Sequence, residues 1–257
     1  MTIVNTGLMA SMELNLSQSH APVPRRDWAL FLDIDGTLID IAPSPDAVKV
    51  SDTLAASLAA AGRWLAGALA IVSGRTFAKI DELMAPLVLP CAGEHGAVIR
   101  LPDGAIRNAG AEHAVPNAWR ERVHVATRNW HGVIAEFKPY SIAVHFRQAP
   151  ARERDVRCLL ETIVAGSAPN FEILSARMAF EIRHRSVTKG AAVHELMKHT
   201  PFFGRTPVFV GDDVTDEDGF RAARDLGGLA LHVNEAFGGE PSNVRRWLKT
   251  FQPPNEG

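Results

Sequence analysis

The sequence predicts an α/β fold in which a doubly wound parallel sheet carries an inserted α+β unit. At both ends of the chain, short apolar runs alternate with amphipathic helical stretches, as in parallel sheets covered by helices. The middle of the chain instead alternates with period two, which is typical of antiparallel strands. The chain has 257 residues, and at roughly 150 residues per domain this length predicts one or two domains.

The first part of the parallel unit is expected over residues 27–108. Residues 28–32 are apolar and stop abruptly at Asp33, which indicates a buried parallel strand. A helix capped by Ser51 follows. Residues 68–72 form a second buried strand. The predicted helix has one apolar face, made of Leu54, Leu58, Ala61 and Leu65.

The second part of the parallel unit is expected over residues 186–250. A helix is predicted at 187–199, and strands are predicted at 208–210 and 229–233. A last helix is predicted near 244–248. These elements continue the alternation of strand and helix and complete the doubly wound sheet.

The inserted unit is expected over residues 109–185. Pro116 begins a helix, and residues 133–147 form a hairpin around Pro139-Tyr140. A helix over 156–163 and alternating stretches at 171–174 and 178–183 follow. Hairpins with helices on one side predict an antiparallel α+β arrangement.

The ends and the overall composition exclude several classes of protein. Residues 1–26 and 251–257 are expected to be a disordered leader and tail. The formal net charge is −2, which argues against a protein that mainly binds nucleic acid or an anionic membrane. No apolar run reaches the ~20 residues of a membrane helix, and no signal peptide is recognised. The widely separated Cys91 and Cys158 indicate a reducing compartment, so we expect a cytoplasmic protein.

Two aspartates directly follow the first predicted strand, in the run Asp33-Ile34-Asp35-Gly36-Thr37-Leu38. Open α/β sheets bind ligands at the carboxyl ends of their strands, and Gly36 permits a sharp turn there. An ordinary Asp-Gly turn is the alternative. A calcium-binding loop is excluded, because its glycine would fall at Leu38 and its glutamate at Ser44. Two unpaired carboxylates at this place favour a bound divalent cation.

A second acidic cluster follows the strand at 208–210, in the run Gly211-Asp212-Asp213-Val214-Thr215-Asp216-Glu217-Asp218. By itself it is also compatible with an acidic helix N-terminus, which the helix dipole stabilises. Two acidic clusters at strand ends of one parallel sheet favour a Mg²⁺ site over that alternative.

A hydroxyl and an ammonium group complete the set of polar groups. Ser73-Gly74-Arg75 ends the second strand, and Lys189 opens a helix. Taken singly, these residues are an ordinary turn and a solvated lysine. Together with the acids they supply what phosphoryl transfer needs: a nucleophilic carboxylate, a carboxyl acid/base, magnesium, and a hydroxyl and an ammonium for the phosphoryl oxygens.

In order and placement, these four elements resemble the haloacid dehalogenase superfamily of aspartate-nucleophile phosphohydrolases. The similarity extends to its trehalose-6-phosphate phosphatase family in Gly93-Glu94-His95-Gly96, in residues 211–220, and in Glu136-x-Lys138 with Ser141-x-x-x-His145-Phe146-Arg147. It spans roughly residues 27–250. Ile34 and Phe146 stand where that family commonly has tyrosine, and Thr188 where it often has aspartate, but no catalytic group is missing.

This resemblance implies a Rossmann-like haloacid dehalogenase core with an inserted α+β cap. It also implies a Mg²⁺-dependent phosphatase of trehalose biosynthesis that hydrolyses trehalose 6-phosphate through an aspartyl-phosphate. Asp33 is the implied nucleophile and Asp35 the acid/base, while Ser73 and Lys189 bind the phosphoryl group. The implied metal ligands are Asp33, Asp35 and Asp212, with Asp213 or Asp216 outside them.

The inserted unit offers a polar face for the sugar. If the hairpin turns symmetrically, Lys138 pairs with Ser141 and Glu136 with Ala143, so polar side chains share one face. Spacing alone favours an ordinary solvated face, and it is the resemblance that implies that Glu136, Lys138 and Glu181 hold the sugar. The predicted substrate-binding set is Gly74, Arg75, Glu136, Lys138, His145, Arg147 and Glu181. His95 is interpreted as a turn residue.

Three alternatives remain open. The chain could act on another phosphosugar, such as a sucrose or mannosylglycerate phosphate. A phospho-acceptor signalling module also has an acceptor aspartate, a hydroxyl and a lysine. Such a module lacks the inserted unit, and it lacks a second acid two residues after the acceptor, where this chain has Asp35. A sugar-sensing pseudoenzyme is disfavoured because no catalytic group is missing. We expect a monomer with a small phosphosugar substrate and no nucleic-acid or membrane partner.

Overall fold

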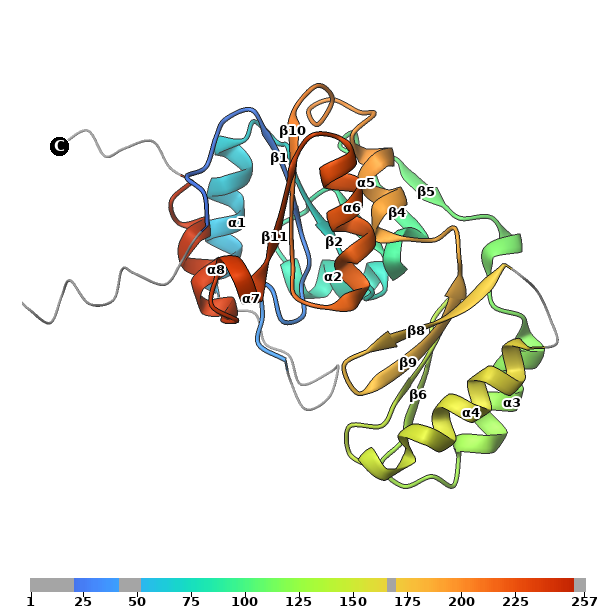
Figure 1. The fold of residues 1–257 in the computed structure, drawn as a ribbon. Coiled ribbons are helices and arrows are strands. Elements are labelled where there is room, and N and C mark those ends of the chain that lie inside the picture. The colour runs from blue at the N-terminus through green and yellow to red at the C-terminus, as the bar shows by residue number, and fades with distance from the viewer. Residues whose placement is uncertain (1–20, 42–51, 166–169, 252–257) are drawn as a thin grey trace, which may run out of the picture.

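The computed structural model describes residues 21–41, 52–165 and 170–251 (Figure 1). The expected leader at 1–20, the helix cap at Ser51 and the tail at 252–257 lie outside these ranges. The described chain forms two sheets, one of seven strands and one of four. Among the described residues, no helix is both long and apolar enough to cross a membrane.

The seven-stranded sheet has the strand order β11-β10-β1-β2-β3-β4-β5. Its first five strands are parallel, and β4 and β5 extend it antiparallel. The parallel α/β core is therefore confirmed. The antiparallel edge was not predicted, because three-residue strands are too short to show a period. The strands are β1 (Trp28–Leu32), β2 (Leu69–Val72), β3 (Cys91–Gly93), β4 (Val98–Arg100), β5 (Ile106–Asn108), β10 (Thr206–Gly211) and β11 (Leu229–His232).

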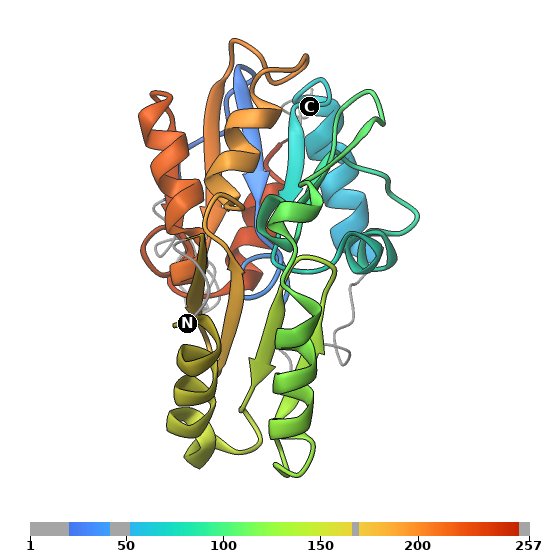
Figure 2. The ribbon, with the colours of Figure 1, turned by 90° about the vertical axis from the view of Figure 1, so that its right-hand side faces the viewer.

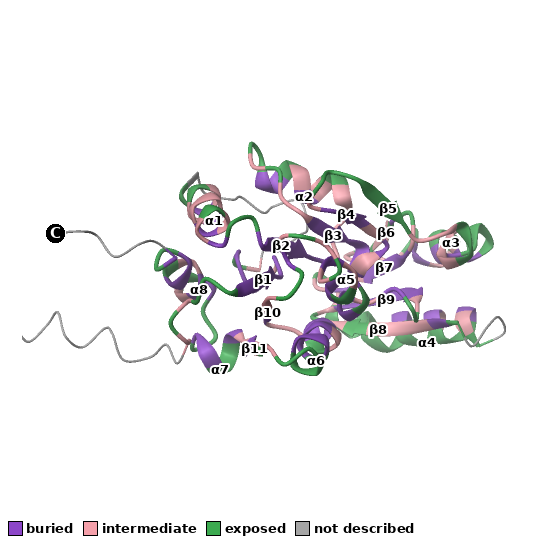
Figure 3. Cartoon of the chain, turned by 90° about the horizontal axis from the view of Figure 1, so that it is seen from above, coloured by how far each residue is buried: buried purple, intermediate pink, exposed green. Residues whose placement is uncertain are grey.

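Helices cover both faces of this sheet. Figure 3 shows α1 and α8 on one face and α5 and α6 on the other. The central strand β1 is buried along its whole length, as its uninterrupted apolar run predicts. The core helices are α1 (Asp52–Trp64), α2 (Phe77–Met84), α5 (Lys189–Leu196), α6 (Glu217–Asp225), α7 (Val233–Ala236) and α8 (Pro241–Leu248).

The four-stranded sheet forms the cap and is antiparallel throughout, with the order β6-β7-β9-β8. Two helices lie on the face that points away from the core (Figures 1 and 2). Between them and the sheet lies a separate apolar cluster, which includes Val144 and Ile182. The cap elements are α3 (Asn117–Thr127), β6 (Ile134–Phe137), β7 (Ile142–His145), α4 (Glu153–Val164), β8 (Phe171–Ala176) and β9 (Ala179–His184).

The hairpin of β6 and β7 has the register that its sequence predicts. Glu136 lies opposite Ala143, and the Lys138 N–H donates to the Ser141 carbonyl at 3.0 Å. Because paired residues point to the same side of a sheet, the polar side chains of the hairpin share the face toward the core, while Ile142 and Val144 are buried in the cap.

Two chain segments connect the core and the cap, and they lie side by side. The segment that enters the cap carries His113, and β9, at the exit, ends with His184. The two imidazole rings meet edge to face, with their centroids 4.4 Å apart. The cap is thus held at one place by a pair of adjacent connections. The domain borders at 109 and 186 stay predictions.

Both ends of the chain contact the core where the structure describes them. The Trp247 Nε1–H donates to the Pro22 carbonyl at 2.9 Å, and Arg205 donates to the Arg26 carbonyl at 2.7 Å. Phe251 is fully buried against Trp247. Burial of aromatic surface and donors for the carbonyl groups hold these residues against the core. The expected disorder of the leader and the tail stays a prediction.

Candidate active site

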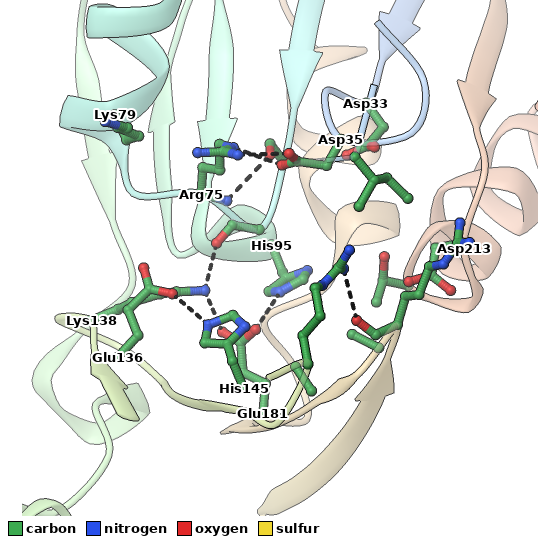
Figure 4. A pocket seen from close by; sticks show the side chains of 18 of the residues that line it. Asp33, Asp35, Arg75, Lys79, His95, Glu136, Lys138, His145, Glu181 and Asp213 are labelled. Carbon is green, nitrogen blue, oxygen red and sulfur yellow. Dashed lines mark hydrogen bonds and ion pairs between the residues drawn. The ribbon is translucent and has the colours of Figure 1, made fainter. Parts of the chain in front are cut away.

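A cavity of about 360 Å³ lies between the carboxyl edge of the core sheet and the polar face of the cap (Figure 4). The structure thus brings together side chains that are far apart in the sequence. All the predicted site residues line this cavity: Asp33, Asp35, Ser73, Gly74, Arg75, Glu136, Lys138, His145, Arg147, Glu181, Lys189 and Asp212.

Asp33 and Lys189 form a buried ion pair at the floor of the cavity. The Lys189 Nζ lies 2.7 Å from Asp33 Oδ1 and 2.6 Å from Asp216 Oδ1. Thr188 caps the helix that Lys189 opens, because its hydroxyl accepts the Ala191 N–H at 3.0 Å. Burial raises the pKa of Asp33 well above its usual range, although the charge of Lys189 opposes this. Burial acts to lower the pKa of Lys189. The charges of Asp216 and Asp33 have the larger effect together, so the pKa of Lys189 is raised above its usual value.

Three carboxylates are close enough to share a metal ion. Oxygens of Asp33, Asp212 and Asp216 all lie within 4.8 Å of one another. Asp212 Oδ1 is buried without a hydrogen-bond partner. Burial, helped by the charges of Asp216 and Asp213, raises the pKa of Asp212 to about 7. The Asp212 carboxylate also occupies the space that a Cβ on Gly36 would fill. These residues fit a hard divalent cation with oxygen ligands.

The carboxylate of Asp35 is not part of this cluster. It forms a bidentate ion pair with Arg75, whose Nε and Nη2 lie 2.7 and 2.6 Å from its two oxygens. Gly36 has φ +77°, and the tight turn that begins at Ile34 directs Asp35 toward the Ser73–Arg75 segment. Among the described residues, the cluster of carboxylate side chains is therefore Asp33, Asp212 and Asp216. The metal ligands Asp33, Asp35 and Asp212 stay a prediction.

Asp213 and Asp216 have structural partners of their own. Asp213 caps the short 3₁₀ turn Val214–Asp216, and its Oδ1 accepts the Val214 N–H at 2.7 Å. Asp216 Oδ2 accepts the N–H groups of Asp212 and Asp213, each at 3.1 Å. The acidic run thus folds back on itself and fixes the Asp212 backbone.

The segment Ser73–Arg75 forms a tight turn at the end of β2. The Arg75 N–H donates to Ser73 Oγ at 3.2 Å. Gly74 is required because a Cβ there would lie only 2.7 Å from the His95 ring. Ser73 is buried, so its hydroxyl is held at the cavity wall beside the core acids.

From the cap, Lys138 and Glu181 close the opposite wall (Figure 4). The Lys138 Nζ donates to Glu181 Oε1 at 3.0 Å and to the Gly74 carbonyl at 2.9 Å. The Ser141 hydroxyl also donates to Glu181. Burial would raise the pKa of Glu181, but the charge of Lys138 and the hydrogen bonds from His95 and Ser141 hold it well below its usual range.

Glu136 is the more accessible carboxylate of the cap. Its Oε2 lies 3.0 Å from His145 Nε2, and its side chain is 36% exposed. Burial would raise the pKa of Glu136, but the hydrogen bond from His145 and the charge of Lys138 lower it. Arg147 lines the cavity too, and its guanidinium donates to the Arg177 carbonyl at 3.4 Å.

The local sequence does not predict that His95 lines the cavity and contacts the cap. Its ring is buried, lines the cavity and places Nε2 3.3 Å from Glu181 Oε2. Glu94 and His95 have φ +47° and +59°, a left-handed conformation that non-glycine residues rarely adopt. The Gly-Glu-His-Gly run indicates a turn, but it gives no sign that the turn faces a strand 86 residues further on.

A doubly wound core with these groups at its carboxyl edge and an α+β cap above them matches what the sequence resemblance to phosphatases of the haloacid dehalogenase superfamily predicts. The sequence model of the trehalose-phosphatase family matches residues 31–249. Over 246 residues the chain is 40% identical to a probable trehalose-phosphate phosphatase of Sinorhizobium fredii, and the match covers 92% of each chain. The chain belongs to the trehalose-phosphatase family.

Two further comparisons agree with this assignment. The chain is 36% identical over 206 residues to the trehalose-6-phosphate phosphatase of Escherichia coli, covering 80% of this chain and 77% of that one. The C-terminal domain of the trehalose-6-phosphate phosphatase of C. albicans superimposes with a TM-score of 0.72 at 20% identity, over 87% of this chain and 92% of that one. At this identity the superposition shows the fold alone.

Proposed function

We propose that this protein hydrolyses trehalose 6-phosphate to trehalose and phosphate, as a step of trehalose biosynthesis. One observation carries the proposal: a single cavity joins the Asp33 carboxylate to the polar side chains of Glu136, Lys138 and Glu181 on the cap. The phosphate fits beside the core acids, and the sugar hydroxyls then face the cap. Membership of the family supports this substrate.

The reaction is proposed to proceed in two displacements at phosphorus. In the first, a carboxylate oxygen of Asp33 attacks the phosphorus, and the bond to the sugar oxygen breaks. Asp35 gives its proton to that oxygen, so trehalose leaves as a neutral alcohol and an aspartyl-phosphate remains. In the second displacement, Asp35 takes a proton from water and the hydroxyl oxygen attacks phosphorus. The bond between phosphorus and the Asp33 oxygen breaks, so phosphate leaves and the Asp33 carboxylate is restored.

Other core residues stabilise the charge that develops on the phosphoryl oxygens. Lys189 reaches Asp33 at 2.7 Å, so its ammonium lies beside the reacting carboxylate, and Ser73 supplies a hydroxyl at the cavity wall. Arg75 holds the ionised Asp35 carboxylate through two hydrogen bonds, and this is the form that takes a proton from water in the second displacement. These groups are held before substrate binds, which reduces the reorganisation needed in the transition state.

The residues suited to hold Mg²⁺ are Asp33 and Asp212, with Asp216 beside them. When held there, Mg²⁺ would supply positive charge that offsets the negative charge of the reacting phosphoryl group. The chain itself supplies the nucleophile, the acid/base and the ammonium.

The cap residues are proposed to recognise the sugar. Glu136 offers the accessible carboxylate, and Lys138 and Glu181 are buried residues that line the same cavity. Arg147 lies at the same cavity and contributes further hydrogen-bond donors. We further propose that the protein is a cytoplasmic monomer, without nucleic-acid or membrane partners.

Phosphate release from a panel of sugar phosphates tests the function. Trehalose 6-phosphate is compared with sucrose and mannosylglycerate phosphates and with a small aryl phosphate, each with Mg²⁺ and with excess chelator. The expected result is Mg²⁺-dependent turnover, with kcat/KM highest for trehalose 6-phosphate. Faster hydrolysis of another sugar phosphate, or full activity in chelator after dialysis, contradicts the substrate or the metal assignment respectively.

A further inference from the structure

Glu94 is a buried carboxylate that joins the core to the cap without lining the cavity. It follows β3, and only 2% of its surface is exposed. Its Oε2 accepts the backbone N–H of Tyr140 at 2.8 Å. Tyr140 lies in the turn of the cap hairpin, between β6 and β7. One core side chain therefore binds the tip of the cap hairpin directly.

The backbone around Glu94 is bonded to the Ser73–Arg75 turn. The Glu94 N–H donates to the Arg75 carbonyl at 2.8 Å, and the His95 N–H donates to the Ser73 carbonyl at 3.0 Å. Both Glu94 and His95 have positive φ, a conformation that persists only where the surroundings determine it. Glu94 thus connects, through its backbone and its side chain, the turn that carries Ser73 and Arg75 to the cap hairpin.

The charges around Glu94 favour a docked hairpin. Burial raises the pKa of Glu94 and the charge of Glu181 adds to the rise, whereas the N–H of Tyr140 and the charge of Lys138 act against it. The Arg120 guanidinium, whose charge also acts on Glu94, donates to the Pro139 carbonyl at 2.9 Å. A buried carboxylate needs such partners, and here the cap supplies them.

We propose that Glu94 is a positioning residue that sets the register of the cap hairpin on the core. The Tyr140 N–H is two residues from Lys138 and four from Glu136, so fixing it fixes both at a set distance from the phosphoryl site. Glu94 itself does not line the cavity in which the phosphate and the sugar are proposed to bind. This inference rests on the proposed function. It assigns Glu94 a role in selecting a sugar phosphate, which contacts the cap, over a small phosphate ester, which does not.

The activity test compares Glu94→Ala with the unaltered protein on trehalose 6-phosphate and on a small aryl phosphate. Loss of a hydrogen bond to a charged acceptor shifts the cap away from its closed position, so we expect kcat/KM for the sugar phosphate to fall about ten- to a hundredfold, mainly through KM. The aryl phosphate should change less than about twofold, because it does not use the cap. Glu94→Gln should restore most of the loss, because its carboxamide oxygen still accepts the Tyr140 N–H.

A second measurement needs no substrate. Hydrogen exchange of the Tyr140 amide should be slow in the unaltered protein and in Glu94→Gln, and at least about tenfold faster in Glu94→Ala. If the unaltered protein does not hydrolyse trehalose 6-phosphate but the exchange responds in this way, the proposed function fails and the docking role of Glu94 stands.

Two more variants keep the test decisive. Glu121→Ala removes an exposed carboxylate of α3 in the cap and should leave both activities and the exchange unchanged. Tyr140→Pro removes the donor N–H and leaves the core intact, and it should reproduce the selective loss even if Glu94→Ala does not fold. Any of three results would overturn the proposal. They are equal losses on both substrates in Glu94→Ala, full selectivity for the sugar phosphate in Tyr140→Pro, and unchanged exchange of the Tyr140 amide in Glu94→Ala.

Discussion

The two sheets supply their polar groups to one cavity in different ways. In the core, Asp33 and Asp212 follow the neighbouring strands β1 and β10, and the Asp33 N–H donates to the Val210 carbonyl at 3.0 Å. A continuous backbone ladder thus fixes their positions. In the cap, Lys138 and Glu181 contact core atoms only through side chains, at the Gly74 carbonyl and at His95.

This difference separates chemistry from recognition. Under the proposed mechanism, the core groups are positioned by the core backbone and should act on any phosphate ester that reaches them. The cap groups are in place only when the cap is docked. Substitutions in the core should therefore affect every substrate, whereas substitutions on the cap face should affect only substrates with a sugar to bind.

The largest expected effect is that of Asp33→Asn. An amide is neither an adequate nucleophile nor a charged ligand, so kcat should fall at least about 10⁴-fold on both trehalose 6-phosphate and an aryl phosphate. Steady-state turnover and the circular dichroism of the same preparation check this. Clear residual turnover in the folded variant rules out Asp33 as the nucleophile.

Asp35→Asn should reduce turnover by about 10²–10⁴-fold, the usual contribution of a general acid/base. With an aryl phosphate, whose phenolate leaves without a proton, the first displacement should persist and the second should stall. A burst of phenolate equal to the amount of enzyme, followed by slow turnover, is the expected rapid-mixing result. A loss of less than tenfold on both substrates means that another residue transfers the proton.

Glu136→Ala sharpens the comparison from the side of the cap. Loss of one hydrogen bond between a sugar hydroxyl and a charged group should lower kcat/KM for trehalose 6-phosphate about ten- to a hundredfold, with little change for an aryl phosphate. Glu161→Ala, on the exposed side of α4, is the matched control.

Glu181→Ala should lower kcat/KM for trehalose 6-phosphate further than Glu136→Ala, because it also leaves the buried Lys138 without its carboxylate partner. Parallel losses on both substrates would remove the assigned role in sugar binding.

The smallest expected effect is a pH dependence of stability that originates at His95. Burial lowers the pKa of His95 below 6.5, although the nearby Glu181 opposes this and Arg183 and Lys189 add to it. The unfolded chain therefore binds a proton that the folded chain does not, and the stabilising contribution is complete above pH 6.5 and lost as the pH falls below it. For one proton the slope is at most about 1.4 kcal/mol per pH unit.

His95→Gln isolates this contribution, because glutamine keeps a donor for Glu181 but does not titrate. Denaturant unfolding from pH 7.5 to 5 should show a steeper loss of stability in the unaltered protein than in the variant. The carboxylate of Glu181 has a lowered pKa, so its own contribution is lost only below pH 4.5, outside this range. Identical slopes in both proteins would contradict the assignment to His95.

Much of the core and its acids could be predicted from the sequence, because the relevant signals are local. An apolar run that ends at Asp33 indicates both a buried strand and the carboxyl edge of a sheet, and the structure has the strand at Trp28–Leu32. The symmetric turn around Pro139-Tyr140 likewise predicted which hairpin residues face the core.

What could not be predicted depends on contacts between distant segments. The pairing of Asp35 with Arg75 spans 40 positions, and it explains why Asp216 rather than Asp35 joins the acidic cluster. Glu94 meets Tyr140 across 46 positions. Nothing in the local pattern of Gly93 to Gly96 distinguishes a turn in solvent from one on which a second sheet docks.

The adjacent entry and exit of the cap have a consequence for how such proteins diversify. Because His113 and His184 touch, the segment between them leaves and rejoins the core at one point, and the pairing of β1 with β10 and β2 does not involve it. The segment between these two residues can therefore be exchanged as a unit. A different segment with the same distance between its ends can be inserted there without changing any strand neighbour in the core. Evolution can thus change the range of substrates while the residues of the core stay the same.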